Sequence, residues 1–109
     1  MSSLHKISSY AEFSDVISSR AAVLLYTSMP NCSVCHALLP QVEALLAHMP
    51  AVHAIHADTA DIPELAGQLT IFSAPAVLFF IHGKVIFRMA RFVPIEELQE
   101  NITQALKMI

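Results

Sequence analysis

The segment 22–35, AVLLYTSMPNCSVC, decides the fold. Its first part, Ala22–Tyr26, is a continuous apolar run between polar residues, which is typical of a strand buried on both faces of a parallel sheet. A loop is expected over Thr27–Asn31, and Cys32 and Cys35 then open a run of apolar residues at helical spacing. The two cysteines therefore stand where a buried strand passes into a helix.

This position suits Cys32 and Cys35 to redox chemistry. One helical turn brings the two sulfurs within reach of a disulfide bond. Free N–H groups and the partial positive charge at a helix start favour the thiolate at the first cysteine. Because the thiolate is the attacking species in exchange, we expect Cys32 to be the exposed nucleophile and Cys35 the buried resolving thiol. His36, when protonated, would help to stabilise the Cys32 thiolate.

Three other interpretations of the pair stay open. The cysteines could simply pack as small apolar side chains. They could form half of a zinc site, although zinc takes four ligands and the chain has no second C-x-x-C. The possible histidine partners match no standard finger spacing: His36, His48, His53 and His56. C-x-x-C-H is also the pattern of haem attachment, which requires export. The strand-then-helix context favours exchange, and we expect no metal and no bound cofactor.

The remaining sequence alternates strand-like and helical segments. The expected strands are Leu4–Ile7, Ala22–Tyr26, Val52–Ala57, Ala76–Ile81 and Val85–Met89. Helical spacing of the apolar residues predicts four helices. The first follows Ser9 as an N-cap, the second runs from Val34 to Met49 with a kink at Pro40, the third covers Ile62–Leu69, and the fourth runs from Pro94 to Ile109. This alternation predicts an α/β fold with a mostly parallel sheet. A turn at His82-Gly83-Lys84 predicts an antiparallel C-terminal hairpin. One domain is expected over residues 1–109.

Composition limits the possible partners. The six Lys and Arg residues are scattered and the net charge is −3, which argues against nucleic acid. A charge so near zero on a chain that is 55% apolar predicts a monomer or a weak homo-oligomer. The longest apolar runs fall far short of the ~20 residues that span a bilayer. Met1–Ser9 lacks the apolar core of a signal peptide, so a cytoplasmic location is expected.

From roughly residue 10 to residue 109 the chain resembles the thioredoxin family. The resemblance rests on the strand–C-x-x-C–helix unit, on Pro40 five residues after Cys35, on Ser73-Ala74-Pro75 before an apolar strand, and on the hairpin. It implies a three-layer α/β/α sandwich with a mixed central sheet. It also implies a cis Ala74–Pro75 bond beside the dithiol, with Pro75 covering the cysteines and keeping metal away.

The resemblance further implies a function. It predicts an oxidoreductase that reduces disulfide bonds of protein substrates through a mixed disulfide. The electrons would come from an external reductase or a low-molecular-weight thiol. The substrate groove would contain seven residues near the dithiol: Asn31, Ser33, Val34, Ala74, Pro75, Arg91 and Phe92.

The chain departs from the family pattern around the dithiol. Tyr26 stands where the family has a buried acid that assists proton transfer, and Ala54 is expected at the position of the lysine that pairs with it. Asn31 replaces a tryptophan, and Arg91 falls at a flexible groove glycine. Loss of the acid removes a general base near Cys35, and tyrosine is a poor base at neutral pH. We therefore expect slower resolution and a specialised protein.

Two other functions fit these departures. The fold could serve as a binding or redox-sensing module with weak or no turnover. Alternatively, Arg91 and Phe92 could favour mixed disulfides of small thiols, as in a glutaredoxin-like enzyme.

Overall fold

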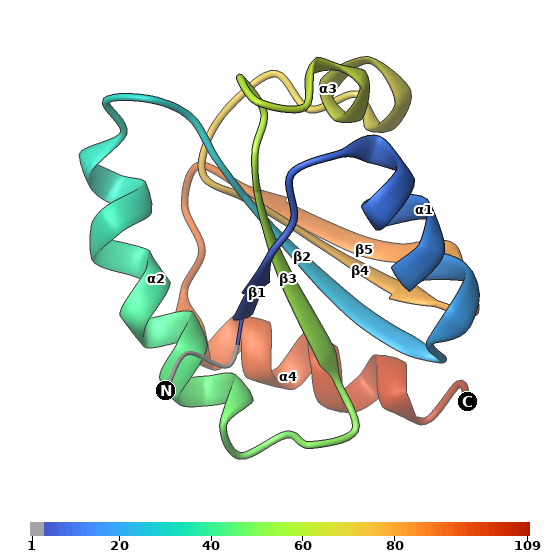
Figure 1. The fold of residues 1–109 in the computed structure, drawn as a ribbon. Helices are drawn as coiled ribbons and strands as arrows, with labels where there is room; N and C mark the ends of the chain where they lie inside the picture. The colour runs from blue at the N-terminus through green and yellow to red at the C-terminus, as the bar shows by residue number, and fades with distance from the viewer. Residues whose placement is uncertain (1–3) are drawn as a thin grey trace.

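The computed structural model describes residues 4–109 and holds five strands and four helices (Figure 1). The single domain expected from residue 1 includes residues 1–3, which lie outside the described part. The order along the chain is β1 Leu4–Lys6, α1 Tyr10–Ser19, β2 Ala22–Ser28, α2 Ser33–Leu46, β3 His53–Asp58, α3 Pro63–Leu69, β4 Ala76–Ile81, β5 Lys84–Ala90 and α4 Ile95–Leu106.

The sheet is mixed, with strand order β1-β3-β2-β4-β5. β3 pairs in parallel with β1 and β2, whereas β4 pairs antiparallel with both β2 and β5. The expectation of a mostly parallel sheet was therefore wrong. Helix α3 lies across the end of the sheet where β2 and β3 finish, not along the sheet (Figure 1). The chain therefore enters β4 at that end, beside the end of β2, with Ala76 opposite Thr27.

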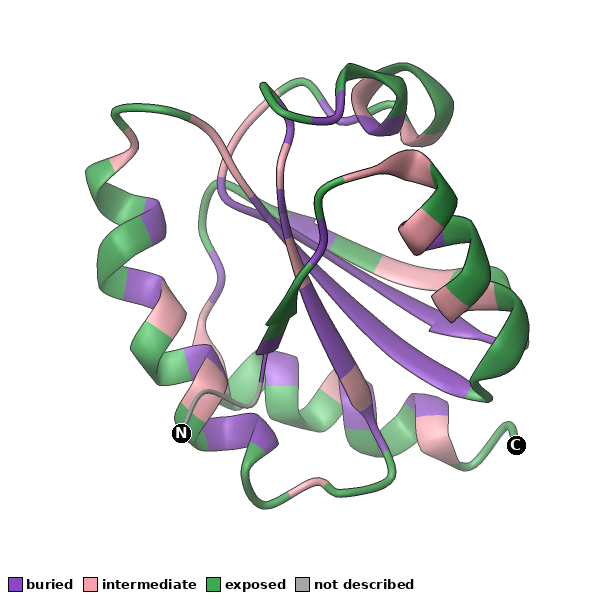
Figure 2. Cartoon of the chain, viewed as in Figure 1, coloured by how far each residue is buried: buried purple, intermediate pink, exposed green. Residues whose placement is uncertain are grey.

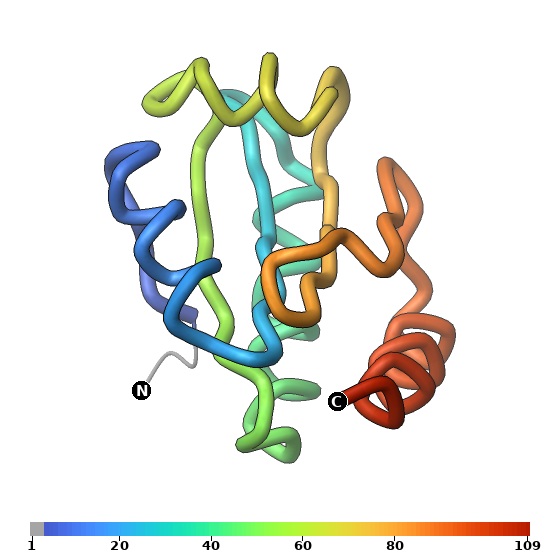
Figure 3. Tube along the Cα trace, turned by 90° about the vertical axis from the view of Figure 1, so that its right-hand side faces the viewer, coloured from blue at the N-terminus to red at the C-terminus, as the bar shows by residue number. Residues whose placement is uncertain are grey.

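Helices cover both faces of this sheet (Figure 3). Alternate side chains of β2 point to opposite faces, as the strand period requires. Leu24 and Tyr26 belong to the core that contains side chains of α2 and α4. Val23 and Leu25 belong to the core that contains side chains of α1 and α3. The central strands are buried almost throughout (Figure 2), and the three-layer sandwich is confirmed.

Several element boundaries differ from the sequence prediction. β2 continues to Ser28, because pairing with β3 extends it beyond the apolar run. The last helix ends at Leu106, and Ile109 is 59% exposed rather than on the buried stripe. The hairpin turns at His82 and Gly83, whose φ angles are 48° and 82°. Two left-handed residues are typical of the tight turn that joins twisted strands, and glycine adopts that conformation without a Cβ penalty. Within residues 4–109, no helix combines the length and apolarity of a bilayer-spanning segment.

The α4 packing is tested by Leu98→Ala. Leu98 is fully buried against the sheet, so its truncation removes apolar contacts and leaves a cavity. We expect the free energy of unfolding to fall by about 2–5 kcal/mol. Urea denaturation would measure it. The neighbouring exposed substitution Gln99→Ala is the control, with an expected change within about 0.5 kcal/mol. Equal effects of the two substitutions would contradict the assigned helix face.

Candidate active site at the start of helix α2

Cys32 and Cys35 are joined by a disulfide, with their Cα atoms 5.3 Å apart. Cys32 is the N-cap of α2, and its Sγ accepts a hydrogen bond of 3.2 Å from the backbone N–H of Cys35. Cys32 is partly exposed, whereas Cys35 is only 3% exposed. After reduction, this N–H and the helix start would stabilise negative charge on Cys32 in preference to Cys35. The asymmetry agrees with the predicted roles of nucleophile and resolving thiol.

Tyr26 is buried and connects the central strand to the dithiol helix. Its hydroxyl donates a hydrogen bond of 2.6 Å to the carbonyl oxygen of Cys35. Burial raises the pKa of Tyr26 to about 12. The side chain is therefore neutral and acts as a donor, not as a base. The acceptor of this hydrogen bond is the backbone of the predicted resolving cysteine.

The neighbour of Tyr26 on β3 is His56, not Ala54. The strand register places His56 opposite Tyr26 and places Ala54 opposite Leu24. The rings of Tyr26 and His56 meet edge to face, with centroids 5.4 Å apart. The expectation at Ala54 was therefore wrong. Spacing along the chain does not determine this neighbour, because the pairing of two distant strands decides which side chain lies beside Tyr26.

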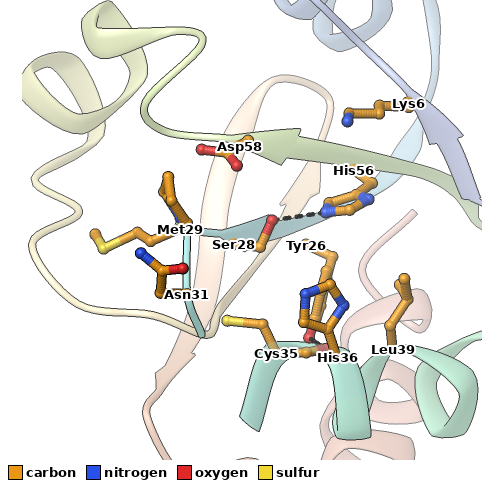
Figure 4. Close-up of a pocket in the computed structure, with 11 residues that line it drawn as sticks. Lys6, Tyr26, Ser28, Met29, Asn31, Cys35, His36, Leu39, His56 and Asp58 are labelled. Atoms are coloured by element: carbon orange, nitrogen blue, oxygen red, sulfur yellow. Dashed lines mark hydrogen bonds between the residues drawn. The ribbon is translucent and has the colours of Figure 1, made fainter. Parts of the chain in front are cut away.

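A cavity of about 180 Å³ lies beside Cys35 (Figure 4). Ser28 and His56 share this space, and Ser28 Oγ is 2.8 Å from His56 Nε2. His36 also lines the cavity from the exposed side of α2. Burial lowers the pKa of His56, so its imidazole is neutral at neutral pH. Sequence reasoning did not single out Ser28, and it considered His56 only as a metal ligand.

Only part of the predicted groove comes together: Val34, Arg91 and Phe92 line one surface hollow, whereas Asn31 lines the cavity beside Cys35. The Ala74–Pro75 bond is cis, in agreement with the resemblance, and the Pro75 carbonyl accepts a hydrogen bond of 2.8 Å from the Arg91 N–H. The exposed fractions are 81% for Phe92 and 55% for Val34. Pro75 is buried and Ala74 is half-buried at the entry to β4.

Two of the substituted positions have left-handed backbone. The φ angle is 62° at Asn31 and 67° at Arg91. Asparagine tolerates this region because its short side chain can bond locally. Arginine bears a strain of roughly 1 kcal/mol there, which explains physically why a glycine suits that position. The sequence did not predict the left-handed conformation of either residue.

Phe72, close to the Pro75 motif in the chain, is an exposed apolar residue that the sequence reasoning missed. It is 78% exposed and lies two residues before Ala74. A large apolar side chain in a loop before the Pro75 motif was the available signal. Among the described residues 4–109, no group of three or more His, Cys, Asp and Glu side chains could hold a metal ion.

Comparison with known proteins places the chain in a family. The Thioredoxin family model matches residues 5–104. A thioredoxin-like protein, YdfQ of Bacillus subtilis, is 34% identical over 108 residues, covering 99% of this chain and 94% of that protein. A thioredoxin of Chlamydia trachomatis is 32% identical over 83 residues, covering 76% of this chain and 80% of that protein.

Solved structures show the same fold at low sequence identity. The thioredoxin of Plasmodium falciparum superposes with a TM-score of 0.86 at 20% identity, covering 93% of this chain and 98% of that one. Oxidised mitochondrial thioredoxin 3 of Saccharomyces cerevisiae gives 0.85 at 19% identity, with 94% and 95% covered. The chain therefore belongs to the thioredoxin family. It is a thioredoxin-like thiol–disulfide oxidoreductase whose redox centre is the Cys32–Cys35 pair.

The Tyr26 hydrogen bond can be tested by Tyr26→Phe. Loss of the hydroxyl should lower the free energy of unfolding by about 1 kcal/mol at neutral pH, measured by urea denaturation. The folded pKa of Tyr26 is about 12 against an ordinary value of 10, so unfolding releases a proton above about pH 10 and wild type loses stability there. The difference between the two proteins should therefore shrink as pH rises from about 10 to 12. Tyr10→Phe on α1 is the control, and an equal loss there would contradict the assignment.

Proposed function

We propose that this protein reduces disulfide bonds in protein substrates. The observation that carries the proposal is the asymmetric dithiol, in which Cys32 is partly exposed at the helix start and Cys35 is buried behind it. The Cys32 thiolate attacks a substrate sulfur and forms a mixed disulfide, releasing the other substrate thiol. Cys35 then attacks Cys32, and the second substrate thiol leaves.

The apolar surface beside the dithiol supports a peptide substrate. Val34, Phe72 and Phe92 are large apolar side chains that are exposed to solvent at this end of the molecule. Exposed aromatic side chains are typical of contact surfaces for other proteins. The exposed Arg91 adds a positive charge, which favours substrates that carry an acidic residue near the disulfide.

The electron donor and the location belong to the same proposal. An external reductase or a low-molecular-weight thiol returns two electrons to the Cys32–Cys35 disulfide, and no bound cofactor is required for this cycle. We propose the cytoplasm as its location. The chain has only two cysteines, both in the dithiol, which suits a reducing compartment where structural disulfides are rare.

The cysteine roles give the first test of this proposal. Insulin reduction should be lost in Cys32→Ser, because the nucleophile is gone. Cys35→Ser should instead accumulate covalent mixed disulfides through Cys32, which non-reducing gels would detect. Cys32→Ser/Cys35→Ser is the control and should capture none. Retained insulin reduction in Cys32→Ser would contradict the mechanism. If the double variant bound the same proteins as Cys35→Ser, a binding module would be the better description.

The substrate surface is tested by Phe92→Ala. Loss of one aromatic contact of about 1 kcal/mol should lower kcat/KM for a disulfide-bonded peptide roughly fivefold. A small disulfide such as hydroxyethyl disulfide does not reach this surface, so its rate should stay unchanged. Val85→Ala, on the exposed side of β5, is the matched control. An equal decrease for both substrates would contradict a peptide-binding role and favour a small-thiol enzyme.

A further inference from the structure

The reaction needs a proton acceptor that the dithiol itself does not provide. An ordinary thiol has a pKa near about 8.5, so a thiol is largely protonated at neutral pH and must lose its proton to attack. Cys35 is buried, and its nearest buried polar side chain, Tyr26, donates a hydrogen bond and has a pKa of about 12. Tyr26 therefore cannot accept this proton. Another group must do so in the resolving step.

The cavity beside Cys35 contains four other titratable side chains: Lys6, His36, His56 and Asp58. Lysine is already protonated at neutral pH, and a carboxylate is a weaker base than imidazole. The Asp58 carboxylate also accepts a hydrogen bond of 2.8 Å from the Ala60 N–H. His36 is exposed on the surface of α2.

His56 differs from these groups because the sheet holds it in place. It lies on β3 opposite Tyr26, is half-buried, and keeps Nε2 2.8 Å from Ser28 Oγ (Figure 4). With its hydrogen on Nδ1, His56 accepts from the Ser28 hydroxyl, as in a serine–histidine relay. The cavity of about 180 Å³ has room for water between this pair and Cys35, since one water occupies roughly 30 Å³.

We propose that the Ser28–His56 pair accepts the proton that Cys35 releases when it resolves the mixed disulfide. This inference rests on the proposed thiol–disulfide exchange and goes beyond it by assigning the proton acceptor. In the mixed disulfide, Cys32 Sγ is bonded to a substrate sulfur and Cys35 is a thiol. Water in the cavity takes the Cys35 proton and passes one to Ser28 Oγ, whose own proton moves to His56 Nε2.

The exchange transfers two electrons from the protein dithiol to the substrate disulfide. The Cys35 thiolate forms a bond to Cys32 Sγ, and the bond from Cys32 to the substrate sulfur breaks with its electron pair on the substrate. The protein dithiol has been oxidised to a disulfide and the substrate disulfide reduced to two thiols. The proton on His56 returns through water to the departing thiolate or to solvent.

The surroundings of His56 keep it ready to accept a proton. Burial is the main cause that lowers its pKa, and the nearby charges of Lys6 on β1 and His36 on α2 act in the same direction. Asp58 and Glu43 oppose this shift, and the neutral Tyr26 covers the ring from β2. The result is a pKa below the ordinary value of about 6.5, so His56 is neutral at neutral pH.

The test uses the reduced protein and an aryl disulfide that releases a coloured thiolate. In stopped-flow absorbance, the first release reports attack by Cys32 and the second reports resolution by Cys35. His56→Gln keeps a polar group near Ser28 but cannot accept a proton. We expect it to slow the second release about tenfold at neutral pH and to leave the first unchanged. His48→Gln, an exposed histidine that does not line this cavity, is the matched control and should leave both rates unchanged.

The pH profile separates proton transfer from a structural role. Below the His56 pKa, wild type should resolve slowly because the imidazole is protonated, and above it the rate should level off. The rate of His56→Gln should instead rise about tenfold per pH unit as Cys35 loses its proton without this base, so a tenfold deficit at pH 7 closes near about pH 8. Ser28→Ala, an independent variant, should also slow only the second release.

The outcomes distinguish the inference from the proposed function. An unchanged second release in both His56→Gln and Ser28→Ala would overturn the inference. A uniform decrease at every pH, or an equal effect of His48→Gln, would also overturn it. Failure of wild type to release even the first thiolate would instead contradict thiol–disulfide exchange by Cys32.

Discussion

The hydrogen bond from the Tyr26 hydroxyl to the Cys35 carbonyl ties the central strand of the sheet to the helix that carries the dithiol. β2 lies in the middle of the sheet, and its side chains belong to both cores. Tyr26 therefore transmits the rigidity of the sheet to the first turn of α2. The Cys35 N–H reaches Cys32 Sγ from that turn, so the geometry of the redox pair depends on this one contact.

A buried neutral side chain at this position has a chemical consequence. A carboxylate there would be costly to bury but would serve as a base. Tyr26 is buried without a charge, and its hydroxyl only donates a hydrogen bond. Proton transfer is then left to side chains that reach the cavity from the ends of β2 and β3. The parallel pairing of these strands brings Ser28 and His56 into contact beside Cys35. The structural role and the proton-accepting role are thus divided between neighbouring side chains.

The surface proposed to bind substrates is shaped by backbone contacts as well as by helix α2. The hydrogen bond between Arg91 and Pro75 joins the end of β5 to the start of β4, and the left-handed conformation of Arg91 turns the chain toward α2. Phe92 consequently lies by Val34 at the dithiol helix. This arrangement places apolar area and one positive charge beside the first turn of α2, at the surface proposed to bind substrates.

The fold class and the dithiol could be predicted from the sequence, because both depend on residues that are close together in the chain. The apolar run of β2, the spacing of Cys32 and Cys35 and the Pro75 motif determine the α/β class, the dithiol and its polarity, because each is a property of adjacent residues. Pairing across the sheet is not local. The antiparallel entry of β4, the contact of His56 with Tyr26 and the meeting of Arg91 with Pro75 join residues far apart in the chain. Only the tertiary structure decided them, because the order, direction and register of the strands set which distant side chains meet.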